Sequence, residues 1–119
     1  MHEPNAQSPE VAVTNTGFRL GGVSGESLAV AWDDVAEIVA YKWDVWGYDI
    51  ICLGFRRRGG EGYIEVGEDF TDYEEFVPCV EARFPLAKDW RRRVAFPAFA
   101  TNWATIWTAT NIQARSASK

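Results

Sequence analysis

The sequence is poor in the side chains that most often carry chemistry. Its 119 residues include a single histidine, His2, in the polar N-terminal stretch. This excludes Ser–His and Cys–His nucleophile pairs and most metal sites built on imidazole. Gly59, Gly60 and Gly62 lack the following Lys and Ser/Thr of a phosphate-binding loop, and they predict a hairpin turn. We therefore expect a protein that is not an enzyme and that holds no cofactor and no metal.

Cysteines are few, and long apolar runs are missing. Cys52 and Cys79 stand among apolar residues, as small buried side chains do, and no CxxC or Cys/His spacing predicts zinc. A disulfide between them stays open at this point. No window is long and apolar enough to cross a membrane, and the first ten residues lack an apolar signal core. We expect a cytoplasmic protein with no integral membrane association.

Aromatic residues, by contrast, are abundant, and the charge balance is acidic. Six Trp, seven Phe and four Tyr are many for this length, and the net charge is −5. Part of the aromatic excess fills a core, and the rest suits a contact surface, where Trp and Tyr are favoured. An acidic chain does not attract nucleic acid through its overall field, but it does attract basic partners. The same charge also serves solubility alone.

Alternating apolar and polar residues in the first half predict a run of antiparallel strands. Glycine-rich or polar turns separate the segments. The predicted strands are 18–20, 28–32, 35–43, 48–56 and 63–66. The segment 35–43 is apolar on both faces near its start, so the pattern leaves open which face is inward.

The periodicity changes after the last of these strands. An i, i+3, i+4, i+7 stripe predicts one helix over 72–83, kinked at Pro78, with Thr71 and Glu74 as a capping box. The aromatic segment that follows from Trp90 predicts an extended tail over the core, ending in a strand.

The predicted fold class is α+β. It consists of an antiparallel meander, as a partly open barrel or a strongly bent sheet, followed by one helix and the aromatic tail, whose final strand spans 104–108. Residues 16–110 form the single domain, with flexible segments at 1–15 and 111–119.

Strands followed by one capping helix are the order found in pleckstrin-homology-like domains. Residues 32–42, Trp-Asp-Asp-Val-Ala-Glu-Ile-Val-Ala-Tyr-Lys, resemble the third-strand region of small bacterial domains of that kind, and the resemblance covers residues 18–84. It implies a binding or scaffolding module, since most such domains bind peptides, proteins or phospholipid head groups. Seven strands usually precede the helix and five are counted here, so the tail would supply a missing strand or cover an open sheet edge. The patterns Ala-Tyr-Lys-x-Asp, Asp-Ile-Ile-Cys-Leu and Ile-Glu-Val-x-Glu-Asp also resemble an uncharacterised family of small bacterial proteins.

The leading candidate site surrounds the first long turn. Its residues are the ionic Lys42, Asp44 and Asp49 and the aromatic Trp43, Trp46 and Tyr48. If Lys42 pairs with Asp49, the ionic residues form either a surface ion pair worth about 0–1 kcal/mol or a polar recognition site framed by the aromatic residues. The first interpretation has more weight because charge pairs on hairpins are common. Trp103 and Trp107 extend the list of candidate contact residues, and Trp107 is the better candidate for the core.

Acidic residues near the helix start allow a second interpretation. Glu65, Glu68 and Asp69 could extend the ionic patch into a divalent-cation site of oxygen ligands, but the helix dipole also explains them.

Six of the nine arginines stand in two triplets, Arg56–Arg58 and Arg91–Arg93. The fork of a guanidinium suits phosphates and carboxylates. Arg56, Arg57 and Arg58 are therefore candidates for an anion site, and the plain alternative is a solvated turn.

The leading hypothesis is a non-enzymatic interaction module of a bacterial cytoplasmic protein. It would bind another protein through an aromatic and acidic surface, as an immunity or antitoxin-like protein neutralising a basic toxin. The alternative is a binder of a small anionic ligand or phospholipid head group through the Arg triplets. An enzyme using Lys42, Asp44, Asp49 and Glu65 would need a deep pocket around them. A homodimer is compatible with each hypothesis.

Overall fold

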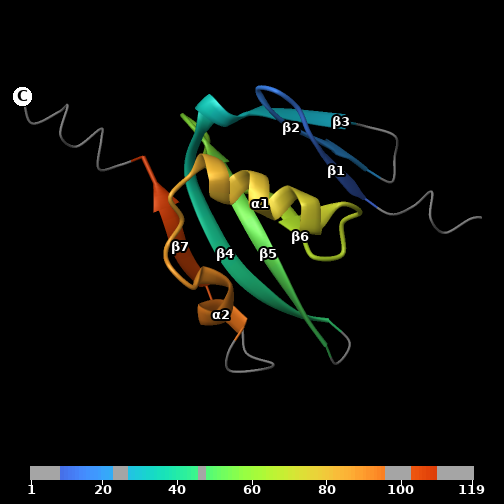
Figure 1. Ribbon diagram of the computed structural model, residues 1–119, viewed down its shortest axis with the longest axis vertical. Coiled ribbons are helices and arrows are strands. Elements are labelled where there is room, and N and C mark those ends of the chain that lie inside the picture. Colours follow the sequence, from blue (N-terminus) through green and yellow to red (C-terminus); the bar gives the residue numbers. More distant parts are fainter. Residues whose placement is uncertain (1–8, 23–26, 46–47, 96–102, 110–119) are drawn as a thin grey trace, which may run out of the picture.

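The computed structural model describes residues 9–22, 27–45, 48–95 and 103–109, and within them the fold is α+β (Figure 1). Seven strands form two antiparallel sheets, one with the order β1-β2-β3 and one with the order β6-β5-β4-β7. In the described part of the chain neither sheet closes into a barrel. The elements are β1 Glu10–Val13, β2 Gly17–Gly21, β3 Ser27–Ala31, the 3₁₀ turn η2 Trp32–Asp34, β4 Val35–Val45, β5 Tyr48–Arg57, β6 Ile64–Gly67, α1 Tyr73–Arg83, α2 Trp90–Ala95 and β7 Trp103–Thr108.

The five predicted strands are confirmed, but they do not form one meander. The 3₁₀ turn η2 lies between β3 and β4, and the chain passes there from the first sheet to the second (Figure 1). Residues 10–13 lie within the predicted lead-in of residues 1–15, yet they form β1. Within β1 the side chain of Val11 is 1% exposed and belongs to the core.

The core lies between the two sheets and the two helices, and Phe18 of β2 is near its centre. The ring of Phe18 lies 5.3 Å from Trp32, 4.9 Å from Phe55 and 5.0 Å from Phe76, between ring centroids. These contacts join the first sheet, η2, the second sheet and α1. Since each large ring buries about 150–250 Å², this aromatic cluster supplies much of the hydrophobic stabilisation.

The predicted helix over 72–83 is confirmed as α1, which continues through Pro78. Its predicted stripe is buried against the core. The predicted capping box of Thr71 and Glu74 is wrong, because Asp72 is the N-cap. Asp72 has the left-handed φ of 72° and makes no side-chain cap hydrogen bond.

A second helix replaces the start of the predicted extended tail. Residues 90–95 form α2, with Trp90 and Val94 buried four residues apart. The prediction of an extended conformation there is therefore wrong, and so is the count of one helix. The predicted strand at 104–108 is confirmed as β7, which pairs antiparallel with β4 and supplies an additional strand.

The pairing of β4 with β7 contains a register shift. Ile38 is opposite Trp107, and Val39 is opposite Thr105. The extra residue, Ile106, lets two successive side chains of β7 pack toward the core, as a bulge does. Ile106 is 4% exposed, and the ring of Trp107 lies 4.6 Å from Phe84. In the described part of the chain, no helix is both long enough and apolar enough to cross a bilayer.

Replacing Phe18 with Ala tests this account of the core. Removing the central ring should lower the free energy of unfolding by about 3–5 kcal/mol, because it leaves a cavity among three other aromatic residues. Urea unfolding measures the change. The matched control is Leu28→Ala at a position that is 38% exposed, where a loss of about 0.5 kcal/mol or less is expected. Similar losses for the two variants would contradict the placement of Phe18.

Candidate functional site

The four-stranded sheet has one face covered by α1 and α2 and one face that no described helix or strand covers (Figure 1). We call the second face the outer face. Side chains of β4 alternate between the two, with Ile38 and Ala40 in the main core and Val39 and Tyr41 in a separate small cluster with Cys52. The outer face is thus built from the alternate residues of each strand.

Four rings on the outer face form what we call the aromatic patch, made of Tyr41, Trp43, Tyr63 and Trp103. The rings of Tyr41 and Trp103 stack with centroids 4.8 Å apart and an interplanar angle of 15°. Trp43 meets Tyr41 edge-on at 6.3 Å, and Tyr63 meets Trp103 edge-on at 5.5 Å. Tyr41 is consequently only 6% exposed, whereas Trp43 and Trp103 remain 50% and 55% exposed.

Gly54 gives the ring of Tyr41 room to lie over β5. A Cβ at this position would lie 2.9 Å from Cγ2 of Val39 and 3.1 Å from Cε1 of Tyr41. Such contacts are closer than van der Waals packing allows, so a larger residue would displace the ring. The glycine therefore positions the centre of the aromatic patch.

The carboxylate of Glu65 lies at the side of the aromatic patch. Its Oε1 accepts hydrogen bonds from the hydroxyl of Tyr41 at 2.7 Å and from Nε1 of Trp43 at 3.2 Å. Burial, and then the bond to Glu65, raise the pKa of Tyr41. Glu65 itself is exposed, and no basic side chain of the described residues pairs with it.

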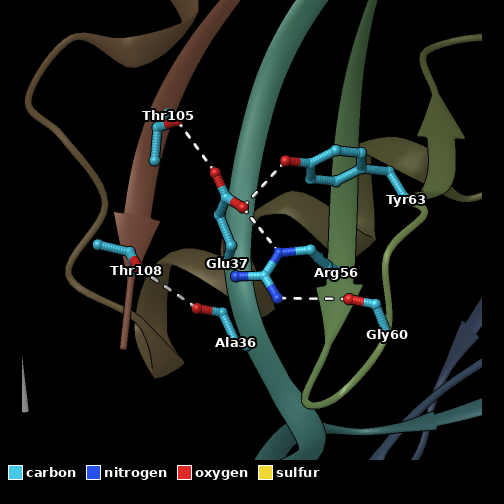
Figure 2. Close-up of polar contacts among 7 residues, drawn as sticks. All are labelled: Ala36, Glu37, Arg56, Gly60, Tyr63, Thr105 and Thr108. Atoms are coloured by element: carbon cyan, nitrogen blue, oxygen red, sulfur yellow. Dashed lines mark hydrogen bonds and ion pairs between the residues drawn. The ribbon is translucent and has the colours of Figure 1, made fainter. Parts of the chain in front are cut away.

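A second carboxylate, Glu37, joins the strands at the other end of the outer face. Figure 2 shows it between β7 on one side and β5 on the other. Its Oε1 accepts from Nε of Arg56 at 2.9 Å and from the hydroxyl of Tyr63 at 2.9 Å, and its Oε2 accepts from Oγ1 of Thr105 at 3.1 Å. Burial alone would raise the pKa of Glu37, but these hydrogen bonds outweigh it and the pKa is lowered.

Lys42 belongs to the opposite face of the sheet, so the predicted site around the first long turn is divided. Its side chain is 1% exposed, and Nζ lies 2.9 Å from the carbonyl oxygen of Ala95 and 3.3 Å from Oδ2 of Asp49. The expected ion pair of Lys42 with Asp49 is therefore confirmed, but its placement at the surface is wrong, because Lys42 is buried. Lys42 is a buried cation at the end of α2, and Trp43 points to the outer face.

Three other predicted residues of this site are only partly covered by the structure. In the β4–β5 hairpin the backbone of Asp44 pairs with that of Asp49, and the backbone of Tyr48 pairs with Val45. The side chains of Asp44 and Tyr48, and all of Trp46, lie outside the described residues.

The two arginine triplets lie toward opposite ends of β4. Arg56 binds Glu37 near the start of β4, whereas α2, with the second triplet, ends beside Lys42. Five strand residues separate these points, a distance of about 17 Å. Arg58 donates from Nε to the carbonyl oxygen of Asp33, and Arg57 is exposed. A shared site for both triplets is therefore not formed.

The residues proposed for catalysis or metal binding do not converge either. Lys42 lies on the covered face of the sheet and Glu65 on the outer face. Oε1 of Glu68 accepts from the backbone N–H of Ile51 at 3.0 Å. Within the described ranges, no three His, Cys, Asp or Glu side chains are arranged to hold a metal ion.

Several residues of the outer face were not predicted as site residues, namely Glu37, Tyr41, Tyr63 and Thr105. The i, i+2 alternation from Glu37 to Trp43 is a signal that could have found two of them. The contribution of β7 has no such signal, because Thr105 and Glu37 are 68 residues apart in the chain.

Comparison with known proteins adds no family. No protein-family model, curated protein or solved structure matches the chain. The pleckstrin-homology-like resemblance therefore stays a prediction.

The hydrogen bonds of Glu37 predict a pH-dependent stability. The pKa is lowered on folding from 4.5, so its stabilising contribution is complete above that value and is lost as the pH falls through the folded-state pKa. Glu37→Gln should lower the free energy of unfolding by about 1–2 kcal/mol at pH 7, and by less at pH 3. Urea unfolding of both proteins at the two pH values measures this. Glu61→Gln, at an exposed turn position, is the control. A difference in the free energy of unfolding between the wild type and Glu37→Gln that stays constant with pH would contradict this account.

The two cysteines are both free, and they should differ in reactivity. Burial, and then the nearby carboxylates of Glu65 and Asp69, raise the pKa of Cys52, whose side chain is 1% exposed. Cys79 on α1 is half-buried. Iodoacetamide should therefore label Cys79 in the native protein and Cys52 only after unfolding, since the thiolate is the reactive form. Peptide mapping by mass spectrometry gives the labelling rate of each cysteine, and Cys79→Ser should remove the fast labelling. Comparable native rates would refute the burial of Cys52.

Proposed function

We propose that the chain is a non-enzymatic protein-interaction module that binds a basic protein through the outer face. The observation that supports this most directly is the exposure of two indoles, Trp43 and Trp103, at about half each on an ordered sheet face. Trp is enriched among the residues that dominate binding energy at protein interfaces. The ring of Tyr41 contacts both indoles, and the ring of Tyr63 contacts Trp103, so the indoles are packed against the sheet.

The negative charge of the chain favours a partner that is positively charged. The chain carries a net charge of −5, and the exposed carboxylate of Glu65 borders the aromatic patch. Complementary charge raises the rate of association and selects among partners. A small acidic domain of this kind suits an immunity or antitoxin-like role in the bacterial cytoplasm, in which it neutralises a basic toxin.

The resemblance to pleckstrin-homology-like domains is part of this proposal. A run of strands before α1 supports it, and β7 supplies one of the strands that the resemblance lacked. The open sheets of the described residues, and a strand placed after the helix, depart from that pattern. Binding through the outer face does not depend on this part of the proposal.

The test is a quantitative capture experiment with three proteins. The wild type, Trp43→Ala/Trp103→Ala and Arg57→Ala/Arg92→Ala are immobilised and exposed to lysate of the source organism. The two arginines are exposed members of the two triplets, so this variant is a matched double truncation that tests the alternative anion site. The wild type and the arginine variant should retain a basic protein. The tryptophan variant should bind it at least about 30-fold more weakly, because losing a binding hot spot worth about 2 kcal/mol lowers the affinity by that factor.

Three results would overturn the proposal. The first is retention of the partner by the tryptophan variant. The second is loss of binding in the arginine variant alone, which would favour an anionic ligand at the triplets. The third is that the wild type captures no protein from the lysate. Circular dichroism and urea midpoints of all three proteins establish that each is folded.

A further inference from the structure

We infer that Glu65 and Trp43 together form a seat for an arginine side chain of the partner, an inference that rests on the proposed function. The carboxylate is already oriented, because its Oε1 accepts from Tyr41 at 2.7 Å and from Nε1 of Trp43 at 3.2 Å. A group held in its bound geometry loses little freedom when it binds. The remaining oxygen, Oε2, is the acceptor for the incoming side chain.

The charges of the surrounding residues single out Glu65. Glu37 on the same face is paired with Arg56 at 2.9 Å, and the carboxylate of Glu74 on α1 is paired with Arg91 at 2.9 Å. Glu65 is exposed, and no described cation pairs with it. Oδ1 of Asp69 lies beside Gly67, where an added Cβ would be 2.7 Å away, so a second carboxylate adds negative charge at this edge. The outer face therefore has an excess of negative charge next to a half-exposed indole.

Arginine fits this pairing better than lysine does. A guanidinium is planar and weakly hydrated, so it can lie on the face of an indole and still donate from its edge to a carboxylate. The molecule uses the same combination internally. The guanidinium of Arg91 lies 5.6 Å from the ring centroid of Tyr73 and 5.9 Å from that of Trp90, while it pairs with Glu74. At Glu65 the acidic and aromatic partners are in place and the guanidinium must come from another molecule.

Two short peptides test the inference in the full chain. The probes are Ac-Gly-Arg-Gly-Arg-Gly-Arg-Gly-amide and its counterpart with lysine at each arginine. They are titrated against protein labelled with ¹⁵N at tryptophan, and the indole N–H signals are followed by NMR at low salt. The arginine peptide should shift the signal of Trp43 and bind at least about 5-fold more tightly than the lysine peptide.

Substitutions assign the effect to the proposed residues. Glu65→Gln should weaken binding of the arginine peptide about 10-fold, because it removes the charge and keeps an acceptor. Glu61→Gln, which removes an exposed carboxylate elsewhere, should leave the affinity unchanged. Trp43→Leu keeps an apolar side chain without a π face, and it should abolish the preference for arginine over lysine. This second variant decides the question if Glu65→Gln is unstable.

The outcomes separate this inference from the proposed function. The arginine seat is wrong if the lysine peptide binds as tightly, if Trp43 does not respond, or if Glu65→Gln binds like the wild type. A Glu65→Gln protein that still captures the cellular partner, while Trp43→Ala/Trp103→Ala does not, would leave the proposed function intact and remove only the seat. Retention of the partner by the tryptophan variant would remove both.

Discussion

The pairing of β7 with β4 is the constraint on which the outer face depends. It brings the segment 103–108 to β4, one of the two central strands of the second sheet. Trp103 thereby stacks on Tyr41, and Thr105 reaches Glu37. The register shift after Ile38 divides β7, since Ile106 and Trp107 both pack toward the core, while Trp103 and Thr105 before the shift face outward. One long-range pairing thus builds both the core contacts and the candidate binding surface.

The outer face protects most of its apolar area with its own side chains. Val39 and Cys52 are almost fully buried although no described element covers this face. They form a small cluster with Tyr41, against which Ile50 packs, and Tyr41 is covered in turn by Trp103. This arrangement leaves the outermost indoles without a cover of their own. On the other face, the buried cation Lys42 donates a hydrogen bond to the carbonyl oxygen of Ala95 at the end of α2, so the two faces of β4 have separate roles.

Local patterns in the sequence predicted most of the fold and little of the site. Strands and α1 follow from alternation and from a helical stripe, which are short-range signals. The six residues of α2 have one buried apolar pair around three consecutive arginines, too short a pattern to outweigh the aromatic segment after it. Trp43 was found through the aromatic excess. The buried position of Lys42 was not predicted, because the segment 35–43 is apolar on both faces and its pattern does not show which face is inward. Glu65 was considered as a metal ligand and as a member of a catalytic group but not as a neighbour of the aromatic residues, since its partners Tyr41 and Trp43 come from another strand.

Simple magnitudes limit what the aromatic patch can do alone. Two half-exposed indoles offer about 250 Å² in total, which at about 25 cal/mol per Å² corresponds to ~6 kcal/mol. Association itself costs about 4–15 kcal/mol, so burial of the indoles roughly cancels the cost of binding. A flat projection of four strands about six residues long measures about 400 Å², half of the ~800 Å² that each partner of a stable complex buries. Specific binding therefore requires the charge of Glu65 and contacts beyond the sheet face, and a partner that supplies only apolar surface would bind weakly.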